Sequence, residues 1–337
     1  MAELLDSDTP DTVRMPVADA VELAISALKR VGYTGEEATI ISDQLIDNAL
    51  CGYKFAGLPR LFLIAHNDKT EAGRVPVKTV HETNLSATLD GGNNIGYLGV
   101  WHAARVAIEK AKKSGMASVG VYNTQFSGRN SYYVEKIVKE GFVALHIGSS
   151  DPRVMPPGAA APALGTNPIC FGFPSKAGPV TVDIGTASIM TGDIRLHSLL
   201  KKPLPEGIAF DRHGEPTQDA DAALGGGVLP FGGHKGYGLS FAMQALGLLA
   251  GSARVRGQVQ DFGFLFWVID PQLMLPGTDF AQLVSELVAK VKATPRRPGV
   301  DEIRIPSERA ARERELRRVQ GIVLEREVVE KIRALKG

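Results

Sequence analysis

A cluster of glycines around a lysine is the feature of this sequence best suited to chemistry. The run Gly232-Gly233-His234-Lys235-Gly236-Tyr237-Gly238 precedes an apolar stretch typical of a helix, residues 239–249. Glycine lets backbone N–H groups approach a phosphate closely, and a lysine adds positive charge. The spacing is not that of a P-loop, because Gly236 stands where Ser or Thr is required, and no GxGxxG occurs. The run is therefore either a loop for an anionic ligand or a structural tight turn.

The histidines and cysteines form no recognisable catalytic or metal motif. None of the seven histidines pairs at the spacing of a zinc site such as HExxH. The two cysteines, Cys51 and Cys170, are too few for a disulfide scaffold and are not spaced as metal ligands. A GxSxG elbow is also missing. The sequence thus predicts neither a metal site nor an α/β-hydrolase.

Composition narrows the class of protein further. The 337 residues carry 38 Lys and Arg against 37 Asp and Glu, a balance that argues against a nucleic-acid partner. With 44% hydrophobic residues but no apolar run of about 18 residues, the chain is expected to be globular with no membrane span. The acidic first residues do not form a secretory signal. With so few cysteines, we expect a cytoplasmic protein.

Hydrophobic periodicity indicates the elements that must position these groups. Two helices are expected within residues 17–50, separated by residues 32–35, with Thr34 as the N-cap of the second. Further helices are expected at 100–113, 132–139, 239–249 and 280–291, with a terminal helix pair in 308–337. Strands are expected at 79–89, 117–122, 143–147, 169–173, 180–183 and 262–269, with a turn at 91–94. Residues 1–14 are expected to be a disordered tail, and the mixture predicts an α/β fold.

Five segments, in order along the chain, resemble successive motifs of one family. They are Leu164–Pro168, Val182–Thr186, Pro203–Ala209, Asp211–Asp219 and Leu229–Leu239. Together they make the chain similar to the type-2 malate/L-lactate dehydrogenase family, from about residue 17 to the C-terminus. That family includes ureidoglycolate and sulfolactate dehydrogenases and Δ1-piperideine-2-carboxylate reductases.

The resemblance implies a malate/L-lactate dehydrogenase type-2 fold and a homodimer. An NAD(P)-binding sheet domain that is not a Rossmann fold is expected at 121–295, which accounts for the absence of GxGxxG. A discontinuous helical domain, for substrate and dimerisation, is expected at 15–120 plus 296–337. The cofactor is NADPH or NADH; Arg304 or Lys201 could meet a 2′-phosphate, or either could be solvated.

The resemblance also implies which residues contact the cofactor. The expected contacts are Ser127, Gly128, Arg129 and Asn130; Ser150; Asp183, Ile184 and Gly185; His234, Lys235 and Gly236; and Glu302, Arg304, Pro306 and Ser307. Asp183 could contact the substrate or orient the nicotinamide.

The sequence departs from the family where the family has two histidines. The early motif reads Ser-His-Gly and, after two further residues, Arg; here Phe55 and Ala56 replace the first pair, whereas Gly57 and Arg60 are kept. The second histidine, the family's presumed acid/base, corresponds to Phe126. Phenylalanine and alanine cannot transfer the proton that oxidation of a hydroxyl requires. Ordinary malate or lactate dehydrogenase activity is therefore not expected.

The retained and neighbouring polar residues are the remaining catalytic candidates. Arg60 suits a substrate carboxylate, and Lys54, Tyr132 and Asp183 could supply other groups. The sequence favours an NAD(P)H-dependent reductase of a C=N bond, or of a C=O bond, beside a carboxylate. An iminium fits best because it already carries its proton. The alternative is a catalytically silent nucleotide-binding or scaffold homologue.

Overall fold

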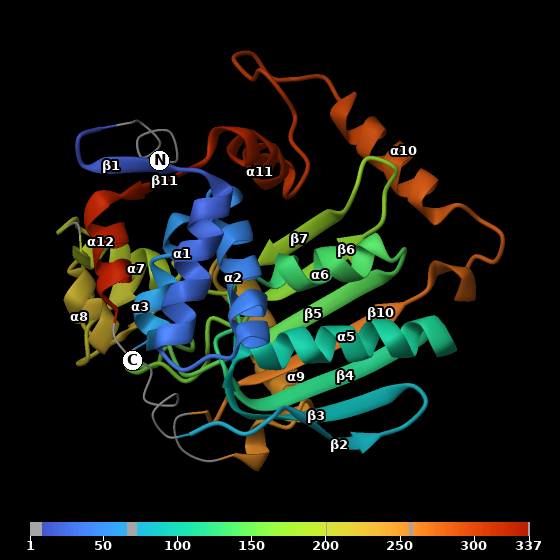
Figure 1. Cartoon of the computed structure of the whole chain (residues 1–337), viewed down its shortest axis with the longest axis horizontal. Coiled ribbons are helices and arrows are strands. Elements are labelled where there is room, and N and C mark those ends of the chain that lie inside the picture. Colours follow the sequence, from blue (N-terminus) through green and yellow to red (C-terminus); the bar gives the residue numbers. More distant parts are fainter. Residues whose placement is uncertain (1–8, 66–72, 200, 256–258, 336–337) are drawn as a thin grey trace. The chain divides into compact units, whose positions relative to one another are not determined.

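The chain forms two compact units. The computed structural model describes residues 9–65, 73–199, 201–255 and 259–335. One unit comprises Met1–Arg74 and Val288–Gly337, and the other comprises Val75–Leu287 (Figure 1). This division differs from the expected boundaries at 120 and 295. The reason is that residues 78–120, expected in the helical domain, contain two strands and the start of a third that belong to the same sheet as strands from residues 143–269.

The larger unit is built on a seven-stranded mixed sheet. Its order is β2-β3-β4-β10-β5-β6-β7, in which only the β3–β4 pair is parallel. The strands are β2 (Lys78–Glu82), β3 (Ser86–Ile95), β4 (Met116–Gln125), β5 (Val143–Ser149), β6 (Ile169–Phe173), β7 (Val180–Ile184) and β10 (Gly263–Ile269). The α/β class is thus confirmed, and the antiparallel neighbours distinguish the sheet from a doubly wound Rossmann sheet.

Two strands occupy the segment expected to be one strand at 79–89. The chain reverses after β2, where the Thr83 hydroxyl accepts hydrogen bonds from the N–H groups of Leu85 and Ser86. The single-strand prediction was wrong because this local side-chain turn competes with the extended pattern. The turn expected at 91–94 lies within β3 as an irregularity, with positive φ at Gly92 and Asn93.

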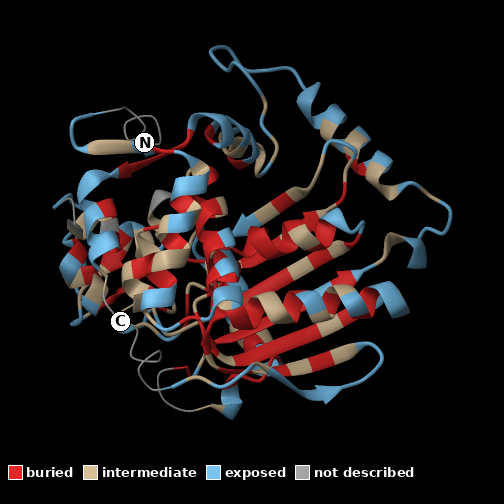
Figure 2. Cartoon of the chain, in the orientation of Figure 1, coloured by how far each residue is buried: buried red, intermediate tan, exposed pale blue. Residues whose placement is uncertain are grey.

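Three helices cover the sheet of the larger unit. Helices α5 (Gly96–Ser114) and α6 (Asn130–Lys139) lie on one face, and α9 (His234–Leu249) lies on the other (Figure 1). The α5 and α6 side holds a core cluster that includes Val119, Tyr133 and Phe266, all 0% exposed. Figure 2 shows that most residues of the central strands are buried.

Smaller elements complete the larger unit. They are α7 (Thr191–Leu199), β8 (Ala209–Phe210), α8 (Ala220–Gly225), β9 (Gly227–Val228), η3 (Ser252–Arg254), η4 (Pro271–Leu273) and α10 (Phe280–Lys292). The boundary between the units falls within α10.

The smaller unit is mainly helical. It contains β1 (Thr12–Met15), α1 (Val17–Arg30), α2 (Gly35–Leu50), η2 (Lys54–Ala56), α3 (Arg60–Ala65), α11 (Glu308–Gln320), β11 (Ile322–Glu325) and α12 (Arg326–Ala334). The predicted cap of α2 is confirmed: Thr34 and Glu37 form a capping box, with Glu37 N–H donating to the Thr34 hydroxyl over 3.3 Å. In the described residues, no helix is long and apolar enough to cross a membrane.

The expected terminal tail and terminal helix pair are joined by a strand pairing. β1 is antiparallel to β11, with Met15 opposite Ile322 and Thr12 opposite Glu325. The prediction of disorder was therefore wrong at Thr12–Arg14, because these residues gain partners some 310 positions away, beyond any local signal. Residues 1–8 lie outside the described part of the chain.

Candidate active site

Several of the predicted cofactor residues of the larger unit lie at one edge of its sheet. Strands β3, β4, β5 and β7 point in the same direction, because antiparallel neighbours separate β4 from β5 and β5 from β7. Their carboxyl ends therefore meet at a common edge. Residues 126–130 follow β4, Ser150 follows β5, and residues 183–185 end β7. Ligands bind at this position in many open α/β sheets.

Asp183 contacts the start of helix α6. Its Oδ2 accepts a hydrogen bond from the Ser131 N–H over 2.8 Å. A carboxylate suits this place because the first N–H groups of a helix have no partner within the helix. The contact joins the end of β7 to the loop at 126–130, two segments that the sequence could place only by resemblance.

Arg129 stabilises the contact between the loop and helix α6 from a buried position. Its Nη1 donates to the Ser131 hydroxyl over 2.6 Å and to Glu135 Oε1 over 3.2 Å, and the residue is only 9% exposed. Arg129 is thus held within the protein by an ion pair with Glu135. This geometry makes it a support of the loop, and the direct cofactor contact expected of Arg129 stays a prediction.

The surrounding protein perturbs two side chains that face each other across β6 and β7. Desolvation raises the pKa of Asp183, against the opposing effects of the Ser131 N–H and the Arg129 charge. Asp183 nevertheless remains an exposed residue, and its contact with water limits that rise. Burial, with the nearby Asp183 charge, raises the pKa of the Cys170 thiol, so Cys170 stays protonated and is no nucleophile.

A network around Asn167 links Ser150 to helix α9. Asn167 Oδ1 accepts from the Ser150 N–H over 3.2 Å, while Nδ2 donates to the Ser240 carbonyl and to Gln244. Ser240 in turn donates to the Gly165 carbonyl. Sequence reasoning singled out the segment Leu164–Pro168 as a family motif but missed Asn167 as the residue that positions Ser150. The signal available in the sequence was an amide side chain directly before Pro168 in a Gly/Pro-rich loop, and the structure shows that this amide is buried.

The glycine run forms an open turn at the start of α9. Gly232 and Gly233 have φ values of 56° and 60°, and a Cβ added to either would meet nothing within 4 Å. His234 and Lys235 follow as exposed residues. Gly236 lies close under the turn, where a Cβ would come within 2.1 Å of the Phe231 carbonyl oxygen. The turn is thus packed against Phe231 at Gly236, whereas the space beside Gly232 and Gly233 is open.

Hydrogen bonds connect this turn to the end of β7. The Phe231 N–H donates to the Thr186 carbonyl over 3.0 Å, and the Thr186 N–H donates to the Thr166 carbonyl. Thr186 is three residues from Asp183. The structure therefore brings the glycine turn and residues 183–185 together.

Tyr132 lies beneath this edge, in the core. It is 4% exposed, its ring meets Tyr133 edge-on at 5.2 Å, and the Lys136 ammonium lies 4.6 Å from its ring centroid. Tyr132 is therefore placed as a packing residue in the described structure.

The predicted substrate residues of the smaller unit lie on η2 and α3. Arg60 begins α3, and its guanidinium carbon lies 5.8 Å from the centroid of the Phe55 ring. The Ala56 carbonyl accepts from Asn48 Nδ2 over 3.0 Å. Gly57 allows this segment to approach α2, because a Cβ there would come 2.9 Å from that of Ala49. Lys54 begins η2, but its side chain lies outside the described part of the structure.

The other predicted cofactor segment of this unit precedes α11. Glu302 pairs with Arg312 over 2.7 Å and more loosely with Arg304 over 3.7 Å, and the Arg304 side chain is 60% exposed. Pro306 is exposed, and Ser307, with a φ of 65°, is the residue before the helix. Arg304 thus remains accessible to a ligand.

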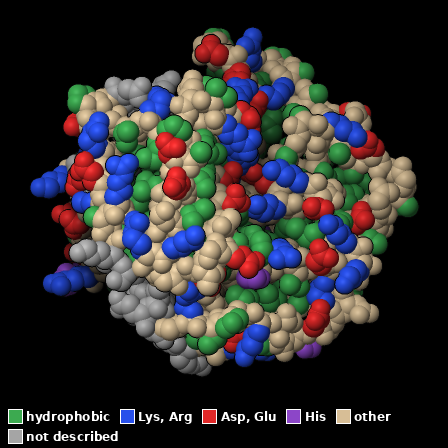
Figure 3. All heavy atoms as spheres, viewed as in Figure 1, with side chains coloured by type: hydrophobic (Ala, Val, Ile, Leu, Met, Phe, Trp, Pro, Cys, Tyr) green, Lys and Arg blue, Asp and Glu red, His purple; other side chains and the backbone are tan. Residues whose placement is uncertain are grey.

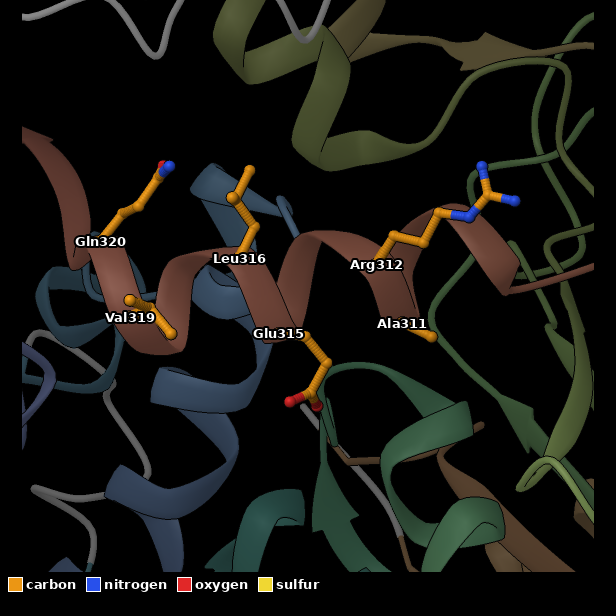
Figure 4. A pocket seen from close by; sticks show the side chains of 6 residues that line it. All are labelled: Ala311, Arg312, Glu315, Leu316, Val319 and Gln320. Atoms are coloured by element: carbon orange, nitrogen blue, oxygen red, sulfur yellow. The ribbon is translucent and has the colours of Figure 1, made fainter.

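A hollow of about 650 Å³ along α11 is lined by none of the residues predicted for the cofactor or the substrate. Figure 4 shows that its lining side chains all come from that one helix: Ala311, Arg312, Glu315, Leu316, Val319 and Gln320. A surface lined by a single helix cannot enclose a substrate. On the face seen in Figure 3, Lys and Arg lie among Asp and Glu and form no patch of one charge. In the described residues, no group of three His, Cys, Asp or Glu could hold a metal ion.

Comparison with known proteins places this fold in one family. The model of the malate/L-lactate dehydrogenase family matches residues 15–333. A malate/(S)-sulfolactate dehydrogenase of Methanothermus fervidus is 32% identical over 329 residues, covering 93% of this chain and 94% of that protein. A Δ1-pyrroline-2-carboxylate/Δ1-piperideine-2-carboxylate reductase of Pseudomonas syringae pv. tomato is 34% identical over 261 residues, or 74% of each chain.

Solved structures agree with the sequence relatives. The sulfolactate dehydrogenase of Methanocaldococcus jannaschii superposes with a TM-score of 0.84 at 30% identity, covering 96% of each chain. The Δ1-piperideine-2-carboxylate reductase of Pseudomonas syringae gives 0.83 at 28% identity, covering 96% of this chain and 99% of that one. The predicted fold is confirmed, and the chain belongs to the malate/L-lactate dehydrogenase family of oxidoreductases.

Proposed function

We propose that this protein is an NAD(P)H-dependent reductase of a C=N bond beside a carboxylate, such as that of a cyclic ketimine. The observation that carries the proposal is the open glycine turn at Gly232–Gly233, held by hydrogen bonds beside the end of β7. Dehydrogenases of this family use nicotinamide cofactors, and relatives named as reductases of cyclic imino acids are among its members.

The residues around the turn fit a nicotinamide dinucleotide. Two successive glycines with positive φ leave the space that a pyrophosphate needs, and the exposed His234 and Lys235 lie at the start of a helix. Ser150 and the segment Asp183–Gly185 lie at the same sheet edge. The remaining contacts assigned by resemblance are Ser127, Gly128, Asn130 and the segment before α11, in which Arg304 is exposed. The cofactor, when bound, supplies a hydride.

The residues proposed for the substrate site suit a substrate carboxylate and offer little acid–base chemistry. Arg60 offers a guanidinium, which pairs well with a carboxylate. Phe55, Ala56 and Phe126 replace the family's polar residues and cannot donate a proton. A protonated imine needs none, because its nitrogen already carries the proton and only the carbon must receive a hydride. The product is the corresponding amine. A C=O substrate would require Lys54 or another group to protonate the oxygen.

We further propose that the active form is a homodimer in a reducing compartment, the cytoplasm. Family resemblance supports the dimer. The two cysteines, Cys51 and Cys170, are both buried and neither forms a disulfide, as in proteins of reducing compartments.

The cofactor is tested by thermal shift with NADH and with NADPH. Binding to the folded state should raise the melting temperature with one or both. Lys235→Ala should reduce that rise, whereas Lys139→Ala, which removes an exposed lysine from the end of α6, should not. Absence of any rise with millimolar NADH and NADPH would overturn the enzyme proposal.

The reaction is tested by turnover of three substrate classes. We expect reduction of Δ1-piperideine-2-carboxylate to be fastest, 2-oxo acids slower, and oxidation of malate or lactate poor, since acid–base catalysis is worth roughly 10²–10⁴-fold. Arg60→Ala should lower kcat/KM for the imine while leaving unchanged the rise in melting temperature that the cofactor causes. Brisk malate oxidation would show that another residue supplies the proton. Cofactor binding with no turnover of any class would instead favour the silent homologue.

A further inference from the structure

Met190 packs on the glycine that follows strand β7. A Cβ added to Gly185 would lie 2.5 Å from Met190 Sδ and 3.1 Å from its Cε. Glycine is needed there for space and not for backbone conformation, because the φ of Gly185 lies outside the left-handed region. The thioether of Met190 therefore occupies the volume that a side chain at position 185 would take.

The backbone holds Met190 in this place. Its carbonyl accepts hydrogen bonds from the N–H groups of Asp193 and Ile194 over 2.9 and 3.1 Å, at the start of α7. Two residues earlier, the Ser188 N–H donates to the Leu229 carbonyl over 2.8 Å, three residues before the glycine turn. The side chain of Met190 thus extends from a fixed point close to the carboxyl end of β7.

Met190 is also accessible to a ligand. It is 37% exposed, whereas its apolar neighbours along the chain, Ala187 and Ile194, are 8% and 4% exposed. A single exposed apolar side chain is common and needs no explanation by itself. Here, however, a glycine makes room for the exposed methionine, at the sheet edge that holds the proposed cofactor residues. Met190 therefore has the position of an apolar wall for a bound molecule.

The chemistry of a thioether fits one part of the proposed substrate. The ring of a cyclic ketimine carries methylene groups, and burial of each is worth about 4-fold in affinity. Methionine is unbranched and polarizable, so it adapts to a puckered aliphatic ring. Asp183 at the same edge and Lys235 at the glycine turn are charged and suit polar contacts instead.

We propose that Met190 contacts the ring of the substrate and so selects a cyclic imino acid over a small 2-oxo acid such as pyruvate. Pyruvate has only a methyl group in place of the ring and gains little from the contact. The inference rests on the proposed reductase activity and names the residue that recognises the apolar part of its substrate.

Two ligands that share a carboxylate but differ in the ring test this contact. Picolinate has a six-membered ring with a nitrogen beside the carboxylate, and oxamate is a pyruvate analogue without a ring that cannot be reduced. Calorimetric titration gives the Kd of each for the protein saturated with NADH or NADPH. Met190→Ala should raise the Kd of picolinate by about 10-fold and that of oxamate by less than about 3-fold. Met190→Leu, which keeps an apolar side chain of similar volume, should bind both ligands like the wild type.

Turnover should change in parallel with binding. In Met190→Ala, the ratio of kcat/KM for Δ1-piperideine-2-carboxylate to kcat/KM for pyruvate should fall by about the same 10-fold. A loss of general stability would lower both values together and leave their ratio unchanged.

Gly185→Ala tests the packing independently. The added methyl group should displace the flexible thioether, so picolinate should bind about as weakly as it does to Met190→Ala. Because both changes remove one contact, the double variant should bind picolinate no more weakly than either single variant. Met274→Ala is the matched control: Met274 is 77% exposed directly after η4, outside the site, and its variant should bind both ligands like the wild type.

The outcomes separate this contact from the proposed enzyme. Equal losses of picolinate and oxamate in Met190→Ala, or no loss of either, would overturn the contact alone. So would a weaker cofactor with unchanged picolinate, which would place Met190 against the nicotinamide. A wild-type protein that is stabilised by the cofactor but does not bind picolinate would also overturn this inference. Absence of any stabilisation by NADH and NADPH would overturn the enzyme proposal together with it.

Discussion

His146 is a titratable residue sealed in the core of the larger unit. It is 0% exposed, its ring stacks on Phe266 with centroids 3.9 Å apart, and its Nδ1 lies 3.1 Å from the Leu265 carbonyl oxygen. Desolvation lowers its pKa to about 3. The ring is therefore neutral at every pH at which the protein works, and we assign the Nδ1 proton to the bond with Leu265.

This burial makes folding sensitive to acid. Unfolded chains take up a proton at His146 below about pH 6.5, while the folded protein resists protonation down to about pH 3, so stability is full above pH 6.5 and falls as the pH drops through this window. At pH 5 the loss is about 2 kcal/mol. His146→Phe should flatten the dependence of unfolding free energy on pH between 6.5 and 4, measured by urea titration. Val268→Ala, a core change without a titratable group, should lower stability but keep the slope; an unchanged slope in His146→Phe would contradict this account.

Asp183 combines a charge with a role as acceptor at a helix start. Asp183→Ala removes the partner of the Ser131 N–H and should cost about 1 kcal/mol of stability. Asp183→Asn keeps an acceptor oxygen and should retain most of that stability while losing the charge. Turnover of the imine separates the two roles. Equal activity in Asp183→Asn and the wild type would show that the carboxylate charge serves no catalytic purpose.

At the scale of elements, the sequence predicted best where the signals were local. The capping box at Thr34 and the apolar periodicities placed α1, α2 and most strands of the sheet. Residues 12–15 were missed because their partners lie at the other end of the chain. For the same reason, resemblance could assign Asp183 and the loop Ser127–Asn130 to one site, but only the fold shows the hydrogen bond from the Ser131 N–H to Asp183.

Close backbone approach holds α9 on its sheet. A Cβ on Gly247 would come within 1.9 Å of the Ser149 hydroxyl oxygen, and one on Gly263 within 2.3 Å of the Gly247 carbonyl oxygen. Gly247→Ala should therefore push the helix outward and cost about 1–3 kcal/mol. Gly238→Ala, on the same helix with open space around it, should be neutral or stabilising by up to about 1 kcal/mol. Comparable melting temperatures for the two variants would show that the helix can move away from Ser149 at little cost in stability.

At the scale of the whole molecule, helix α9 begins at the proposed cofactor turn and packs on the sheet of the larger unit. Lys235 is exposed at that turn, so Lys235→Ala should raise the Kd for NADH or NADPH without changing the melting temperature of the cofactor-free protein. An unchanged Kd would show that Lys235 does not contact the cofactor.

Across the whole molecule, the pairing of β1 with β11 has a consequence for the order in which contacts form during biosynthesis. Residues 75–287 make up the larger unit without interruption, so its contacts are all available once that stretch has left the ribosome. The smaller unit cannot complete its β1–β11 pairing until Ile322–Glu325 have been synthesised. The Arg30 guanidinium likewise gains its hydrogen bonds only once the carbonyls of Ile332 and Leu335 are present. Contacts of such long sequence separation form slowly. The first helices to be made, α1 and α2, are thus among the last to gain all their partners, and during translation they are the segments most in need of a chaperone.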